Sequence, residues 1–198
     1  DRLGVLSSLP IRTDVSQALY RESYKHTATA FKEDARQVLE TLLAGKWRVY
    51  VVTNSNPEVV GKKLDALAPK GRERLGLVGD AKKYVVTEPV ARDARFDAVP
   101  ETIQVEGLDT RPIYLRRGRY YEVLRTIWQA SGTTPERTIV CGDIWELDLA
   151  LPQALGAHVH LVERPTTLHY ERNAIATAGE RGGITPTLTG FIDRLRRA

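Results

Sequence analysis

Short apolar runs rich in β-branched residues alternate with helical patterns between residues 32 and 162. The run WRVYVVT at 47–53 follows an amphipathic pattern at 32–46 and precedes a second helical pattern at 56–67. A strand that is apolar at nearly every position is typical of a parallel sheet covered by helices on both faces. The alternation therefore predicts an α/β fold with a doubly wound, mostly parallel, Rossmann-like sheet.

Other segments extend this pattern along the chain. Asn56 is expected to cap the helix at 56–67, with Pro57 in its first position, and the helix at 146–155 contains a proline that should kink it. We expect strands at 82–87, 102–105, 137–141 and 158–162, and helices at 14–27, 120–131, 146–155 and 186–198. Residues 1–198 should form a single domain, in which 1–30 supply either the first strand or the remnant of a helical cap.

Composition narrows the class of protein. The net charge of +4 mildly favours anionic ligands, but the basic residues are spread out, so we expect no nucleic-acid partner. The sequence has no apolar run long enough to cross a bilayer and no secretory signal, so no membrane partner is expected either. A single cysteine, Cys141, excludes an intramolecular disulfide and fits a cytoplasmic location.

Polar and charged residues follow two of the predicted strands. Thr53 ends the strand at 47–53, and Asp143 follows the strand at 137–141 within the stretch TIVCGDIWELD. A carboxylate beside an apolar core requires hydrogen bonds, a basic side chain or a metal ion. Because α/β sheets bind ligands at the carboxyl ends of their strands, both residues are expected to face a functional site.

Three stretches, in order, resemble motifs of a known family. VYVVTNS, YLRRGRYYEVL and TIVCGDIWELD are similar to the second, third and fourth motifs of the haloacid dehalogenase-like (HAD) superfamily, over roughly residues 30–165. The resemblance implies a Mg²⁺-dependent phosphohydrolase that acts on a small phosphorylated substrate. It also implies that the Thr53 hydroxyl and the Asn54 amide bind a phosphoryl oxygen.

The same resemblance gives roles to charged residues. Arg117, or alternatively Arg116, supplies the positive charge of the third motif, and an arginine keeps that charge at any physiological pH. Asp143 binds Mg²⁺, which prefers oxygen ligands, and Asp148 orients the metal site or a metal-bound water. Each residue also has a purely structural interpretation: Thr53 and Asp143 are suitable caps, and paired arginines are common on solvated surfaces.

The first motif of the family, D-x-D-G-T, has no match in the sequence. Its first Asp is the nucleophile, and its strand lies between the strands that end at Thr53 and Asp143. One alternative is that this strand lies upstream of Asp1, and the absence of a Met at position 1 favours this alternative. The other is that RLGVLSSL at 2–9 takes the place of the strand without supplying an acid. Asp1 and Asp14 are the only early acids that could replace the nucleophile.

Two other classes of function remain open. A non-catalytic protein of the same fold would bind a phosphorylated ligand or a protein partner with the same residues. A nucleotide-binding Rossmann-like protein is less well supported, because neither G-x-G-x-x-G nor G-x-x-x-x-G-K-[ST] occurs.

Overall fold

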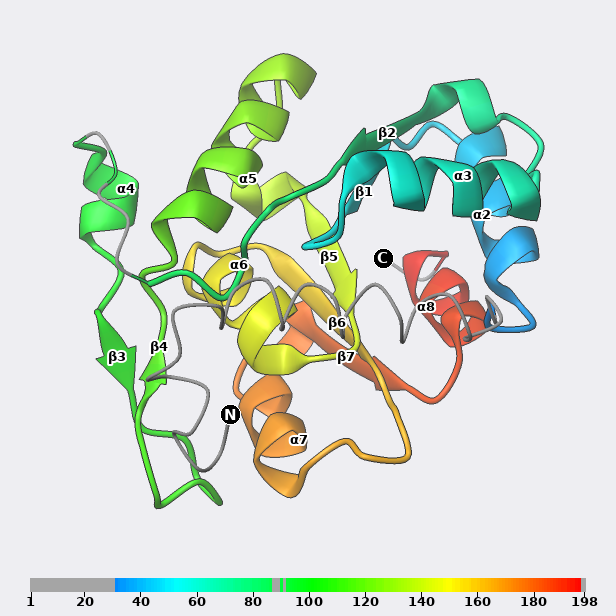
Figure 1. Cartoon of the computed structure of the whole chain (residues 1–198). Coiled ribbons are helices and arrows are strands. Elements are labelled where there is room, and N and C mark those ends of the chain that lie inside the picture. The colour runs from blue at the N-terminus through cyan, green and yellow to red at the C-terminus, as the bar shows by residue number, and fades with distance from the viewer. Residues whose placement is uncertain (1–30, 87–89, 91, 197–198) are drawn as a thin grey trace, which may run out of the picture. The chain divides into compact units, whose positions relative to one another are not determined.

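The computed structural model describes residues 31–86, 90 and 92–196 (Figure 1). The chain divides into two units, Asp1–Lys32 and Glu33–Ala198, and the helices and strands of the described residues all lie in the second. The helix predicted at 14–27 and the alternatives for 1–30 lie outside the described residues. None of the helices in the described ranges is long and apolar enough to cross a membrane.

The fold is mixed α/β with short parallel sheets. β1 (Val49–Val52) pairs in parallel with β2 (Leu75–Val78), and the connection between them contains α3 (Pro57–Leu67). β5 (Ile139–Gly142), β6 (His158–Val162) and β7 (Gly182–Thr185) form a second parallel sheet. Within the described part of the chain no strand joins β1 to β5, so these are two separate sheets.

The remaining elements surround these sheets. A small antiparallel pair, β3 (Thr102–Ile103) and β4 (Ile113–Tyr114), follows the short helix α4 (Ala94–Asp97). The other helices are α2 (Ala35–Ala44), α5 (Gly118–Ser131), α6 (Ala150–Ala154), α7 (His169–Ala176) and α8 (Leu188–Leu195), with a π-helical turn, η4 (Trp145–Leu149), directly before α6.

Both faces of β5 are covered, as its apolar sequence predicts. Ile139 and Cys141 pack with Val38 of α2 and Phe191 of α8, whereas Val140 contacts the main core on the opposite face. Alternate residues of a strand point to opposite sides, so both sets can be buried together. Figure 1 shows α2 and α8 beside each other near this sheet.

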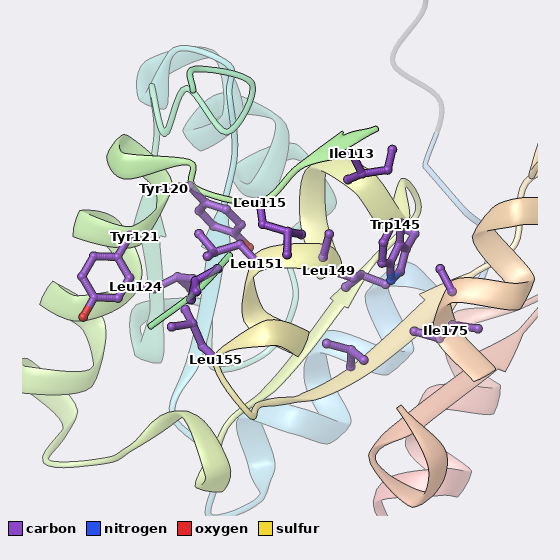
Figure 2. Packing of buried hydrophobic residues seen from close by; sticks show 14 of the residues in the cluster. Ile113, Leu115, Tyr120, Tyr121, Leu124, Trp145, Leu149, Leu151, Leu155 and Ile175 are labelled. Atoms are coloured by element: carbon purple, nitrogen blue, oxygen red, sulfur yellow. The ribbon is translucent and has the colours of Figure 1, made fainter. Parts of the chain in front are cut away.

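The main core lies where α5 and α6 meet the sheet of β5, β6 and β7. Tyr120, Leu124, Leu151 and Leu155 converge there (Figure 2), and Val159 and Leu161 of β6 are fully buried. Burial of a single large apolar side chain contributes about 1.5–3 kcal/mol. A separate cluster between α2, α3, β1 and β2 contains Leu43, Leu64 and Leu75.

Most predicted helices and strands are confirmed. Some match their predicted ends to within one or two residues, and others cover only part of the predicted range. Helices occur within 32–46, 56–67, 120–131, 146–155 and 186–198, and strands within 47–53, 102–105, 137–141 and 158–162. Asn56 accepts hydrogen bonds from the Glu58 and Val59 amides, which confirms it as the cap of α3.

The strand predicted at 82–87 is wrong over its described residues. Residues 82–86 form a turn and irregular chain, and Tyr84 and Val86 are exposed. Lys82 has a φ of 45°, which is incompatible with a strand. The strand that pairs with β1 is instead LGLV at 75–78, where Gly76 lies directly against the Tyr50 ring.

Candidate functional site

The turn after β1 contains the predicted phosphate-binding residues. The Thr53 amide donates to Val78 O at 2.9 Å, and the Ala81 amide donates to Thr53 O at the same distance, so the turn is fixed to the end of β2. The Thr53 hydroxyl accepts from the Ser55 amide at 3.1 Å. The Asn54 amide makes no hydrogen bond within the described residues, which leaves a backbone donor at the carboxyl end of β1.

Lys83 is a site residue that the sequence interpretation missed. Its amide donates to Asn54 Oδ1 at 2.7 Å, and its ammonium group bonds to Asp148 Oδ1 and lies 3.4 Å from Val52 O. The side chain is only 11% exposed. Lys83 therefore connects the carboxyl end of β1 to the helical turn that follows β5.

Asp148 is buried at the junction of β5 and η4. Besides the bond to Lys83, its Oδ2 accepts from the Ile144 amide at 3.1 Å, so both carboxylate oxygens have partners. Gly142 is required beneath it, because a Cβ at that position would overlap the Asp148 side chain. Tyr120 donates to Asp148 O at 2.9 Å; burial and, secondly, the charge of Asp148 raise the pKa of the Tyr120 phenol.

Asp143 differs from Asp148 in its exposure and in its partners. Its side chain is 52% exposed, and its only ion pair within the described ranges joins Oδ2 to Arg164 Nε at 3.7 Å, too long for a hydrogen bond. Asp143 therefore has a carboxylate that can accept a further cation, whereas the oxygens of Asp148 are already bonded.

A second buried carboxylate, Glu171 of α7, stabilises the turn that carries Asp143. Its side chain is 1% exposed; Oε1 accepts from the Trp145 amide at 3.0 Å and Oε2 from the Leu168 amide at 2.9 Å. Arg164 Nη2 lies 3.5 Å from the same Oε2. The adjacent amides of Ile144 and Trp145 are thus both bonded to carboxylates of the chain itself, so neither is available to a bound anion.

The two predicted arginines diverge. Arg117 is 3% exposed and donates to Tyr114 O, Lys83 O and Glu146 Oε1 at 3.0–3.1 Å. Burial lowers the pKa of Arg117, and Glu146 partly offsets this effect. Arg116 donates to the carbonyls of Val99 and Asp97, next to α4. Arg117 is thus held against the backbone of Lys83, whereas Arg116 is bonded to a different segment.

Glu146 joins Arg117 to a further arginine. Arg111 makes two hydrogen bonds to the Glu146 carboxylate, at 2.6 and 3.1 Å, and this contact raises the pKa of Arg111. The segment between Lys83 and Arg117 is therefore attached to η4 near both Arg111 and Arg117.

The sites predicted from sequence come together only in part. Lys83 contacts Asn54 and Asp148 and is bonded by Arg117, but no hydrogen bond or ion pair among the described residues joins Thr53 to Asp143. The signal for Lys83 was present as the sequence GDAKK after an apolar run, but the assignment of 82–87 to a strand concealed it.

Among the described residues Asp143 offers Mg²⁺ a single half-exposed carboxylate, with the Arg164 guanidinium nearby. No group of three or more His, Cys, Asp or Glu side chains is suitably placed for a metal in the described ranges. Mg²⁺ commonly binds through one or two carboxylates together with substrate phosphates and keeps several waters, so Asp143 would hold it beside a bound phosphate. Asp148 could bind the same ion only if one of its carboxylate oxygens lost its present hydrogen bond.

No protein-family model, curated protein or solved structure matches this chain, so its residues and geometry carry the functional inference.

Proposed function

We propose that the chain is a HAD-like, Mg²⁺-dependent phosphohydrolase of a small phosphate ester whose nucleophilic Asp is not among these 198 residues. The observation that carries this proposal is the position of Lys83, whose ammonium group lies between Val52 O at the end of β1 and Asp148 after β5. A phosphoryl group requires positive charge around its oxygens and donors that hold it in line. A lysine at this position supplies the charge as a compact ammonium group that Asp148 holds in place.

Each proposed role uses a group with suitable geometry. The Asn54 amide and the Thr53 hydroxyl would bind phosphoryl oxygens at the end of β1, and Lys83 would stabilise the negative charge. Asp143 would hold Mg²⁺, which when bound neutralises charge on the phosphate. Arg117 contributes through its contact with the Lys83 backbone, and Asp148 holds the Lys83 ammonium group.

The proposal includes one continuous, doubly wound sheet. β1 and β5 each pair with a described strand on one side only, and Lys83 and Asp148 bridge their carboxyl ends. Strands two places apart in a sheet are separated by about 10 Å. A strand between β1 and β5 would complete the sheet and would end beside Lys83, where the family has its nucleophile; no nucleophile is assigned among residues 31–196.

A metal titration tests the role of Asp143. Mg²⁺ should raise the melting temperature of the wild type, and Asp143→Asn should abolish that shift, because the substitution removes the charge of the half-exposed carboxylate. Equal shifts in the two proteins would contradict the assignment. Asp193→Asn, at an exposed position in α8, serves as a control and should respond to Mg²⁺ like the wild type.

An activity assay separates this proposal from a non-catalytic alternative. The alternative is favoured by the lack of a D-x-D sequence and by the bonded oxygens of Asp148. For the 198-residue chain we expect no phosphate release from a generic phosphate ester above that of Asp143→Ala, because catalytic groups do not act independently. An added upstream strand ending in D-x-D should restore turnover if the protein is an enzyme, whereas a binding protein would remain inactive.

A further inference from the structure

Four carboxylates lie on or against the segment that follows β5, and four cations neutralise them. The carboxylates are Asp143, Glu146, Asp148 and Glu171, and the cations are Lys83, Arg111, Arg117 and Arg164. Asp148 has Lys83, and Glu146 has two arginines. Arg164 alone is shared by two acids, Asp143 and Glu171.

The two acids that share Arg164 contact it in different ways. Glu171 is buried, is bonded to two backbone amides, and is therefore fixed. The Arg164 backbone is also fixed, because its amide donates to the Thr167 hydroxyl at 2.7 Å and its carbonyl accepts from the Thr167 amide at 3.0 Å. The Arg164 Nε–H is buried and makes no hydrogen bond, although it faces Asp143 at 3.7 Å. Arg164 is therefore held near Asp143 without being tightly bonded to it.

We propose that Arg164 is the internal counter-ion of Asp143 and that Glu171 positions it, so that these two residues set the affinity of Asp143 for a divalent cation. This inference rests on the proposed metal role of Asp143. The positive charge of Arg164 opposes an incoming cation, and the negative charge of Glu171 reduces that opposition. Arg164 and Glu171 thus act in opposite directions although they contact each other.

Mg²⁺ titrations of four proteins test the inference, with the melting temperature as the readout at constant ionic strength. The proteins are the wild type, Arg164→Gln, Glu171→Gln and the double variant. Arg164→Gln should bind Mg²⁺ roughly three- to tenfold more tightly, since a unit charge is removed within a few ångströms of the site. Glu171→Gln should bind roughly threefold more weakly, and the double variant should lie within about twofold of the wild type.

The two single variants are expected to change Mg²⁺ affinity in opposite directions. Loss of structural support alone would instead weaken Mg²⁺ binding in both. If both single variants weaken Mg²⁺ binding, or if Arg164→Gln leaves it unchanged, the inference is wrong. Arg172→Gln is the matched control: Arg172 lies on α7 beside Glu171 but pairs with Glu163, so its loss should not change Mg²⁺ affinity. If wild type and Arg164→Gln both fail to bind Mg²⁺, the proposed metal role fails as well.

A spectroscopic measurement on the wild type avoids dependence on the stability of the variants. The ¹H–¹⁵N signal of Arg164 Nε, assigned by comparison with Arg164→Lys, should shift as Mg²⁺ is added and should saturate with the dissociation constant obtained from melting. The Nε signal of Arg172 should not move. An unchanged Arg164 signal, in a wild-type protein whose melting temperature rises with Mg²⁺, would overturn the inference while leaving the proposed function intact.

Discussion

The turns after β1 and β5 both end a parallel strand, but they are stabilised by different forces. The turn at 53–55 is held by backbone hydrogen bonds to Val78, Asp80 and Ala81 and contains no charged side chain. The segment at 143–148 is held by buried carboxylates and their cations. A neutral turn with an available amide is suited to an anion, whereas a half-exposed carboxylate is suited to a cation, so under the proposed function the first turn would face the phosphate and the second the metal.

The largest loss of stability should come from removing a buried carboxylate of the segment at 143–148. Asp148→Ala removes the partner of a nearly buried lysine and the acceptor of the Ile144 amide, so we expect a loss of about 3–5 kcal/mol in the free energy of unfolding. Asp143→Ala should change it by less than about 1 kcal/mol, because its only ion pair among the described residues is long and half-exposed. Urea denaturation measures both; similar losses would contradict the distinction between the two acids.

An intermediate effect is expected from Arg117. Arg117→Ala should weaken phosphate or vanadate binding by about 1–3 kcal/mol, because the Lys83 backbone loses a charge-assisted donor. Arg119→Ala, at an exposed position in the same helix, should change binding by less than about 0.5 kcal/mol. Calorimetric titration with Mg²⁺ present gives these values. If Arg116→Ala weakens binding and Arg117→Ala does not, the two arginines have exchanged roles.

Two adjacent lysines, Lys83 and Lys82, allow a direct comparison of their contributions to phosphate binding. Lys83→Gln should weaken phosphate binding by about 1–3 kcal/mol if its ammonium group contacts the anion. Lys82→Gln should leave binding unchanged, since Lys82 is exposed and no contact joins it to Asp148 among the described residues. The same calorimetric titration applies, and equal effects would show that only net charge matters.

The smallest effect should appear in the neutral turn. Thr53→Val removes the acceptor of the Ser55 amide and should reduce the free energy of unfolding by about 0.5–1.5 kcal/mol. If Thr53 also binds phosphate, the same substitution should weaken phosphate binding, whereas Asn56→Ala, which removes only a helix cap, should reduce stability by about 1 kcal/mol without that effect. Thermal melts and phosphate titrations together separate the two roles.

The strengths and failures of the sequence interpretation follow from what each pattern encodes. The apolar runs around Val51, Val140 and Val159 predict strands well because apolar residues of these strands pack against clusters of the core, although only β6 is buried along most of its length. β2 and β7 were missed because β2 contains one glycine and β7 contains two, and glycine is depleted in strands. Their glycines are explained only by tertiary contacts, such as the Arg194 side chain against Gly183.

The candidate site was predictable only where a strand end fixes the position of a residue. Thr53 and Asp143 lie at the ends of β1 and β5 as expected. The sequence could not show that Lys83 would reach Asp148, 65 residues away, or that Glu171 would bond to the Trp145 amide. Such contacts depend on how loops pack over a sheet edge, and neither propensity nor periodicity encodes that packing.

The hydrogen bond from Arg117 to the Lys83 carbonyl has a consequence for how the protein can change over time. It joins two residues 34 positions apart, so the two ends of the segment between them stay together whatever lies at its far end. Phe96 and Ile113 of this segment are buried in the core, and Val105 and Leu108 pack against the same core, whereas residues 109–110 at the tip are exposed. Lengthening a loop at such a tip costs little, about 0.6 kcal/mol for each doubling of its length. Insertions at 109–110 should therefore leave Lys83 and its partners in their positions.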